Sequence, residues 1–118
     1  MSKFSQIAID GLSNVDPSQI PADASFTIEQ RITAGDEMAD QYHVVIDAGS
    51  IDVHTGPATH PDVVMTQDVD TAEALRVGRL HAQGAFLTGR LSIDGDVNGL
   101  LEFGPVLSQL LSHRETNA

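Results

Sequence analysis

The segment that most constrains the fold is LHAQGAFLTGRLSIDGD, residues 80–96, which joins a helical turn to a strand and to the start of a helix. Residues 91–94 alternate between apolar and polar side chains, and a period of two marks a strand with one buried face. Gly95 breaks this strand, and the carboxylate of Asp96 can cap a helix that begins near Val97. Because these neighbouring elements are short, their apolar side chains must share one interior.

The rest of the chain has its strands first and its helices late. Alternating apolar residues and short polar turns indicate three consecutive strands in an antiparallel meander, and two more strands follow. This order predicts an α+β fold, a five-stranded, mainly antiparallel sheet with helices covering one face. Such a sheet can hold either a dry core or an apolar cavity between the sheet and the helices, and the periodicity does not distinguish the two. The predicted strands cover residues 25–34, 41–48, 50–55, 62–67 and 91–95, and the predicted helices cover residues 70–79, 82–88 and 97–112.

The segment before the first strand is predicted to be a helix followed by a linker. Apolar residues repeat with helical spacing from Phe4 to Leu12, and two prolines among polar residues predict an extended linker over residues 15–23. A chain of 118 residues has the length of one domain. We therefore expect a single domain over residues 1–118, with residues 1–23 as its N-terminal helix and linker.

Local signals set the predicted turns and helix ends. The polar run GDEMAD, residues 35–40, predicts a hairpin turn, and Gly49-Ser50 predicts a tighter one. Thr71 can cap the helix that follows the fourth strand. The pair Gly104-Pro105 interrupts the last helix, so residues 106–113 are expected to dock as a separate helix over one mouth of the cavity.

The charge of the chain limits its partners. It carries 17 acidic residues against 6 basic ones, a net charge of −11, so phosphate backbones and anionic lipid headgroups repel it. We therefore expect no nucleic acid partner. Because no run of about 18 apolar residues occurs and the N-terminus lacks the apolar core of a signal peptide, we expect no stable membrane insertion and predict a cytoplasmic location.

Catalytic and metal-binding patterns are weak in this sequence. The chain has no cysteine, which excludes disulfides and thiol chemistry. Its five histidines are scattered without an HExxH motif, and Ser92 lacks the glycines of a nucleophile elbow. Gly84, Gly89 and Gly95 lack the spacing of a phosphate loop. We therefore predict no catalytic residue, no metal and no cofactor, and the protein is not expected to be an enzyme.

One ordered motif resembles a known family. An acidic residue opens an apolar strand, a helix carrying leucine and glycine follows, and the segment AF-x-x-G-[RK]-L-x-[IV]-x-G-[DN] comes last. From Phe26 to about Phe103 the chain is therefore similar to the sterol carrier protein 2-like sterol-binding family. The matching residues are Asp62, Leu75, Gly78, Ala85, Phe86, Gly89, Arg90, Leu91, Ile93, Gly95 and Asp96.

The resemblance implies a tunnel between sheet and helices that holds sterols, fatty acids, acyl-CoA or similar lipids without chemistry. Gln30 interrupts the apolar face of the first strand, and it can either bind a ligand headgroup or lie as a satisfied polar residue at the rim of the sheet. Arg90 can attract a fatty-acid carboxylate or pair with one of the many aspartates. The residues expected to line the tunnel are Phe26, Ile28, Val44, Ile46, Met65, Leu75, Phe86, Leu87, Leu91, Ile93, Leu100, Leu101, Phe103 and Leu107.

Two functions fit these observations. The first is non-catalytic binding and transfer of a hydrophobic small-molecule lipid, which the hydrophobic effect would hold with few polar anchors. The alternative is a cavity-poor interaction or accessory domain that associates with an enzyme partner or with a second copy of itself, since the family that this chain resembles also occurs as a module of larger enzymes.

Overall fold

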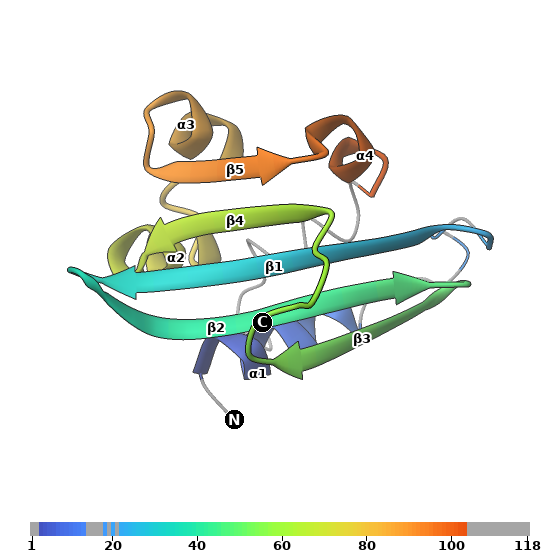
Figure 1. Ribbon diagram of the computed structural model, residues 1–118. Coiled ribbons are helices and arrows are strands. Elements are labelled where there is room, and N and C mark those ends of the chain that lie inside the picture. Colours follow the sequence, from blue (N-terminus) through green and yellow to red (C-terminus); the bar gives the residue numbers. More distant parts are fainter. Residues whose placement is uncertain (1–2, 14–17, 19, 21, 104–118) are drawn as a thin grey trace.

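The computed structural model describes residues 3–13, 18, 20 and 22–103, and its elements follow the predicted order (Figure 1). Each predicted strand and helix has a counterpart among these residues, so the α+β prediction is confirmed. The predicted break at Gly104-Pro105 and the separate helix over residues 106–113 lie outside the described residues. The helices are α1 (Lys3–Leu12), α2 (Val69–Arg76), α3 (Ala82–Leu87) and α4 (Val97–Leu101), and the strands are β1 (Ser25–Ala34), β2 (Glu37–Asp47), β3 (Ser50–Thr55), β4 (Val63–Asp68) and β5 (Leu91–Gly95).

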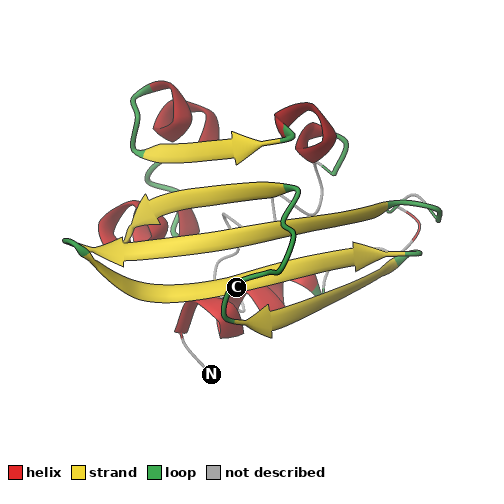
Figure 2. Cartoon of the chain, in the orientation of Figure 1, coloured by secondary structure: helices red, strands yellow, loops and turns green. Residues whose placement is uncertain are grey.

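The strands form one five-stranded sheet in the order β3-β2-β1-β4-β5. Neighbouring strands pair antiparallel except at the centre, where β1 and β4 are parallel. Because β3 lies at one edge and β4 lies beyond β1, the connection between them, residues 56–62, has to cross one face of the sheet. We call the face that this connection crosses the outer face. Figure 2 shows this loop in front of the strands. The prediction of a mainly antiparallel sheet is confirmed, with one parallel pair at its middle.

Every second residue of the central strands points to the inner face, which we define as the side of the sheet that the helices cover. Phe26, Ile28 and Ile32 of β1 are buried there. The helix α1 packs against β2 and β3 and buries Ala8 and Leu12, while α2 packs against β1 and β4. Both helices lie behind the sheet in Figure 1. The domain therefore has a helical layer on one side and a crossing loop on the other.

The first hairpin is tighter than predicted. The expected turn over residues 35–40 is wrong, because β2 begins at Glu37 and only Gly35 and Asp36 separate it from β1. Asp40 is buried, and its Oδ2 accepts a hydrogen bond of 3.1 Å from the backbone N–H of Phe4. A contact with α1, distant in sequence, thus stabilises a polar residue that its local pattern assigns to a turn.

The second hairpin turns at Ala48-Gly49 and not at Gly49-Ser50. Ala48 has a φ of 51° and Gly49 a φ of 84°, and the flanking residues Asp47 and Ser50 pair with each other. Two successive positive φ angles twist a two-residue turn in the sense that matches the flanking strands. Alanine is an unfavourable residue in this left-handed conformation because its Cβ crowds the backbone.

Aspartates cap two helices, and only one of them was predicted. Asp96 caps α4 as expected, because its Oδ1 accepts a hydrogen bond of 2.9 Å from the N–H of Gly99. The cap of α2 is Asp68 and not Thr71, and Asp68 Oδ1 accepts a bond of 2.7 Å from the N–H of Thr71. The hydrogen bonds from Thr71 lower the pKa of Asp68 below its usual value, and the positive charge of Arg90 adds to this effect.

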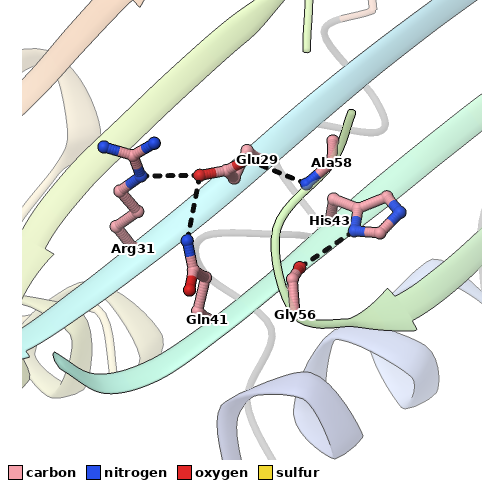
Figure 3. A network of polar contacts seen from close by, with 6 residues as sticks. All are labelled: Glu29, Arg31, Gln41, His43, Gly56 and Ala58. Atoms are coloured by element: carbon pink, nitrogen blue, oxygen red, sulfur yellow. Dashed lines mark hydrogen bonds and ion pairs between the residues drawn. The ribbon is translucent and has the colours of Figure 1, made fainter. Parts of the chain in front are cut away.

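A buried carboxylate on the outer face fastens the crossing loop (Figure 3). The side chain of Glu29 in β1 is 1% exposed. Its Oε1 accepts a hydrogen bond of 2.9 Å from the backbone N–H of Ala58 in the loop. Its Oε2 accepts bonds of 2.6 Å from Arg31 Nε and 3.2 Å from Gln41 Nε2. Burial disfavours the charged form of Glu29, yet these hydrogen bonds outweigh burial and hold its pKa below the usual value.

Two further contacts fix the ends of the same loop. At its start, His43 Nδ1 donates a hydrogen bond of 3.0 Å to the carbonyl oxygen of Gly56 (Figure 3). At its end, Asp62 exchanges two bonds with Thr27, accepting from the Thr27 N–H at 2.7 Å and donating its own N–H to the Thr27 carbonyl at 2.9 Å. The carbonyl of Asp62 also accepts the N–H of Asp96 at 2.9 Å. Asp62 therefore joins β1, β4 and the end of β5 at one point.

Replacing Glu29 with glutamine tests the loop anchor. Glu29→Gln should lower the free energy of unfolding at neutral pH by about 1–3 kcal/mol, because a neutral amide accepts less strongly and leaves Arg31 without its carboxylate. The folded-state pKa of Glu29 is depressed, so its stabilising effect is present above the usual glutamate pKa and is lost as the pH falls through the folded-state value. Urea unfolding of both proteins should therefore show a difference at neutral pH that shrinks in acid.

The exposed strand residue Glu37 provides the control for this experiment. Glu37→Gln should leave the unfolding free energy nearly unchanged at both pH values. A gap between Glu29→Gln and the wild type that stays constant with pH would contradict the ionised anchor.

Relieving the strained turn residue should stabilise the protein. Ala48→Asn places asparagine, which tolerates a positive φ, before Gly49, and it should raise the unfolding free energy by about 0.5–1 kcal/mol. Thermal denaturation would measure the gain. The matched change Ala39→Asn, at an exposed residue of β2, should give none. Equal melting temperatures for Ala48→Asn and the wild type would show that the turn is not strained.

Candidate ligand-binding face

Most of the predicted lining residues meet on the inner face. The rings of Phe26 and Phe103 lie 5.2 Å apart, so Phe103, two residues after the end of α4, packs over the start of β1. Their common burial gives one continuous apolar core cluster, and its use as a lipid site stays a prediction. The buried members are Phe26, Ile28, Val44, Ile46, Met65, Leu75, Leu91, Leu100 and Phe103, and Ile93 is partly buried against them.

Three of the remaining predicted lining residues do not join this cluster. Phe86 and Leu87 of α3 are 44% and 73% exposed, and Leu101 of α4 is 66% exposed. In α3 the buried side chain is Ala85, so this short helix turns its larger apolar residues outward. Leu107 lies outside the described residues. The helical part of the predicted lining therefore divides between the core and the surface.

Two glutamines interrupt the apolar inner face. Gln30 is fully buried and pairs with Tyr42 on one side and Met65 on the other, so its predicted place at the rim of the sheet is wrong. Gln67 Nε2 donates a hydrogen bond of 3.0 Å to Gln30 Oε1. Gln30 Nε2 has a weak acceptor, the sulfur of Met65 at 3.6 Å. These contacts join β1 to β4 through side chains as well as through the backbone.

The second glutamine has a hydrogen-bonding group that the fold leaves unused. Gln67 is 5% exposed, and its Oε1 has no hydrogen-bond partner among the described residues. A buried acceptor without a donor costs about 1–3 kcal/mol of stability. Sequence reasoning overlooked Gln67, although its spacing of two from Met65 and four from Val63 places all three on one face of β4.

The ionisable groups near the inner face are structural. Burial, together with the negative charge of Asp40, raises the pKa of Tyr42 well above its usual value and keeps the phenol neutral. Arg90 is exposed and lies beside a surface cleft that Asp70, Glu73 and Arg79 also line.

Within the described ranges, no three potential metal ligands come together. No helix in that part of the chain is long and apolar enough to cross a membrane.

Comparison with known proteins gives a family and a set of similar folds. The model of the SCP-2 sterol transfer family matches residues 14–108. No curated protein matches. The solution structure of palmitated SCP2L2 from Aedes aegypti is 20% identical, and the match covers 99% of this chain and 100% of that one with a TM-score of 0.68. Sterol Carrier Protein-2 from the same organism, solved in complex with the C16 fatty acid palmitate, is 23% identical, with coverages of 92% and 98% and a TM-score of 0.61.

The same fold also occurs inside a larger enzyme. The sec-alkylsulfatase Pisa1 from Pseudomonas sp. is 18% identical over 86% of this chain and 15% of that one, with a TM-score of 0.62. This chain therefore corresponds to a small part of that enzyme. The family model, in contrast, spans every strand of the sheet, and the chain belongs to the SCP-2 sterol transfer family.

Proposed function

We propose that the protein binds and transfers apolar lipids between the inner face of the sheet and its helices, without catalysing a reaction. The observation that carries this proposal is the gathering of most of the predicted lining residues into one apolar cluster between the sheet and the helices. Family membership supports it, and so do the palmitate-bound relatives with the same fold. The ligand class is a long-chain fatty acid, a sterol, an acyl-CoA or a similar lipid.

The physical basis for binding is the removal of apolar surface from water. Each buried methylene group contributes about 0.8 kcal/mol. Among the buried residues that the structure describes, polar side chains are few, so most of the affinity would come from the tail. Such a site accepts ligands of different shapes and depends strongly on their length. The cytoplasmic location that the sequence predicts stays a prediction.

A series of fatty acids of increasing length tests the proposal. The acids should displace a fluorescent fatty-acid probe with an affinity that rises with chain length until the site is full. Leu100→Trp enlarges a buried residue of the inner face, and it should weaken long acids more than short ones. Titrations with both proteins measure this change in length dependence.

The adjacent residue Leu101 provides a matched control, because the same substitution there adds volume at the surface. Leu101→Trp should leave the length dependence unchanged. The proposal fails if affinity is independent of chain length, or if Leu100→Trp only lowers stability without a selective loss of long ligands.

A second candidate function is an interaction or accessory domain. It is favoured by the exposed apolar residues Phe86, Leu87 and Leu101 and by the occurrence of the fold within an alkylsulfatase. Organic extraction followed by mass spectrometry separates the two candidates, since a carrier purified from cells should contain lipid and an interaction domain should not.

The exposed leucine of α3 allows a direct test of self-association. If α3 forms a homodimer interface, the wild type should show a mass above the 12.6 kDa of one chain in sedimentation at high concentration. Leu87→Ser should return it to the monomer mass, and Gln83→Ser on the same helix should not. A monomeric wild type would contradict a homodimer and leave an enzyme as the partner of this second candidate.

A further inference from the structure

We propose that Gln30 and Gln67 form an internal polar anchor that selects ligands ending in a neutral hydroxyl over ligands of the same length ending in a carboxylate. This inference rests on the proposed lipid binding and names the headgroup that the inner face would accept. It starts from the hydrogen bond between the two carboxamides, which use only part of their bonding capacity on each other.

The anchor offers one acceptor and one donor. The bond from Gln67 Nε2 to Gln30 Oε1 leaves Gln67 Oε1 without a partner and leaves Gln30 Nε2 with a thioether sulfur at 3.6 Å. The acceptor Gln67 Oε1 and the donor Gln30 Nε2 are thus the remaining polar atoms of the two hydrogen-bonded carboxamides. A hydroxyl is a donor and an acceptor at once. It can therefore donate to Gln67 Oε1 and accept from Gln30 Nε2 while remaining neutral.

A carboxylate does not fit the same position. When ionised it only accepts hydrogen bonds, so it would face the free oxygen of Gln67 with like partial charge. Burying its charge would also require a cation. Among the described residues, no arginine is buried, and the buried polar residues are Glu29, Gln30, Asp40, Gln67 and Thr71. Glu29 belongs to the outer face, whereas Asp40 lies opposite the buried Ile32 and adds a carboxylate to the inner face. The buried side chains of the inner face therefore offer amides, hydroxyls and a carboxylate but no positive charge.

The anchor lies within the apolar cluster and not at its edge. Gln30 is in the central strand β1, and Gln67 pairs with Ile32 of β1 and Leu91 of β5. Ile32 and Leu91 are both buried. A hydroxyl bound between the two glutamines would thus have apolar side chains around it, and the tail of the ligand would run along the inner face toward Phe26 and α4.

Three probes of equal chain length test this anchor in the wild-type protein. They are hexadecan-1-ol, its methyl ether, which accepts but cannot donate, and hexadecanoate, each used to displace a fluorescent fatty-acid probe. The alcohol should bind about tenfold more tightly than the ether, because only the alcohol supplies a donor to Gln67 Oε1. The ionised acid should also bind more weakly than the alcohol. An alcohol-to-ether ratio near one would overturn the anchor.

The double variant Gln30→Met and Gln67→Met removes both amides at nearly constant volume, and Gln30 is included because Gln67→Met alone would free Gln30 Oε1 to accept from the alcohol. It should bring the alcohol-to-ether ratio close to one, and Gln83→Met at an exposed position should leave the ratio unchanged. If the two glutamines have only a structural role, the double variant will change the melting temperature but keep the ratio of the wild type, and the proposal is then wrong.

These outcomes separate the anchor from the proposed function. If the three probes fail to displace the fluorescent lipid from the wild type, lipid binding itself is refuted and the anchor falls with it. If affinity increases with chain length but the alcohol has no advantage, lipid binding stands and the anchor alone is refuted.

Discussion

The parallel pairing of β1 with β4 is the contact on which the rest of the structure depends. It joins the meander of β1, β2 and β3 to the antiparallel pair of β4 and β5, and without it there would be two small sheets. Parallel neighbours require a crossover connection, which here passes over the outer face. Two hydrogen bonds hold that connection to β1, one from Ala58 within the loop to Glu29 and one from Thr27 to Asp62 at the end of the loop. The inner face exists because these outer contacts fix the position of β4.

The same pairing brings the two buried glutamines together. Ile32 lies opposite Gln67 and Gln30 lies opposite Met65, so the side chains of Gln30 and Gln67 meet across the strand boundary. Binding lipid through apolar contacts alone would not require a buried acceptor that lacks a donor. Under the proposed function, the inner face would combine apolar side chains without selectivity and a small polar group that recognises one kind of headgroup. Different residues would then contact the tail and the headgroup of the lipid.

Much of this fold could be predicted from the sequence because its strands follow a simple period. Residues 91–94 and the alternation in β1 identify strands correctly, and the ordered motif from Asp62 to Asp96 identifies the family. Gly95 shows why the motif ends in glycine: its φ is 114°, and a side chain there would collide with the backbone of Asp62. The positive φ is a property of this one residue, and because glycine adopts it most readily, the requirement can be recognised in the sequence.

The errors arose where distant contacts decide the structure. Asp40 belongs to a strand because the N-terminus of α1 supplies its hydrogen-bond donor, which no local pattern contains. The orientation of α3 depends on which side chain fits against β5, and the small Ala85 is buried while Leu87 is not. Gln67 could have been placed on the inner face by its spacing. The hydrogen bond between Gln67 and Gln30 could not be predicted in the same way, because it depends on the register between β1 and β4.

The position of β4 in the sheet also has a consequence for the order in which the chain folds. Ile28 pairs with Val63, whereas β2 and β3 follow β1 directly through short turns. Closing a long loop costs more chain entropy than closing a hairpin, so the meander should form early and the β1–β4 pair late. During synthesis the apolar side of the meander would then stay open to water until β4 and β5 have emerged. For that interval, a molecular chaperone would meet the same surface that the finished domain encloses.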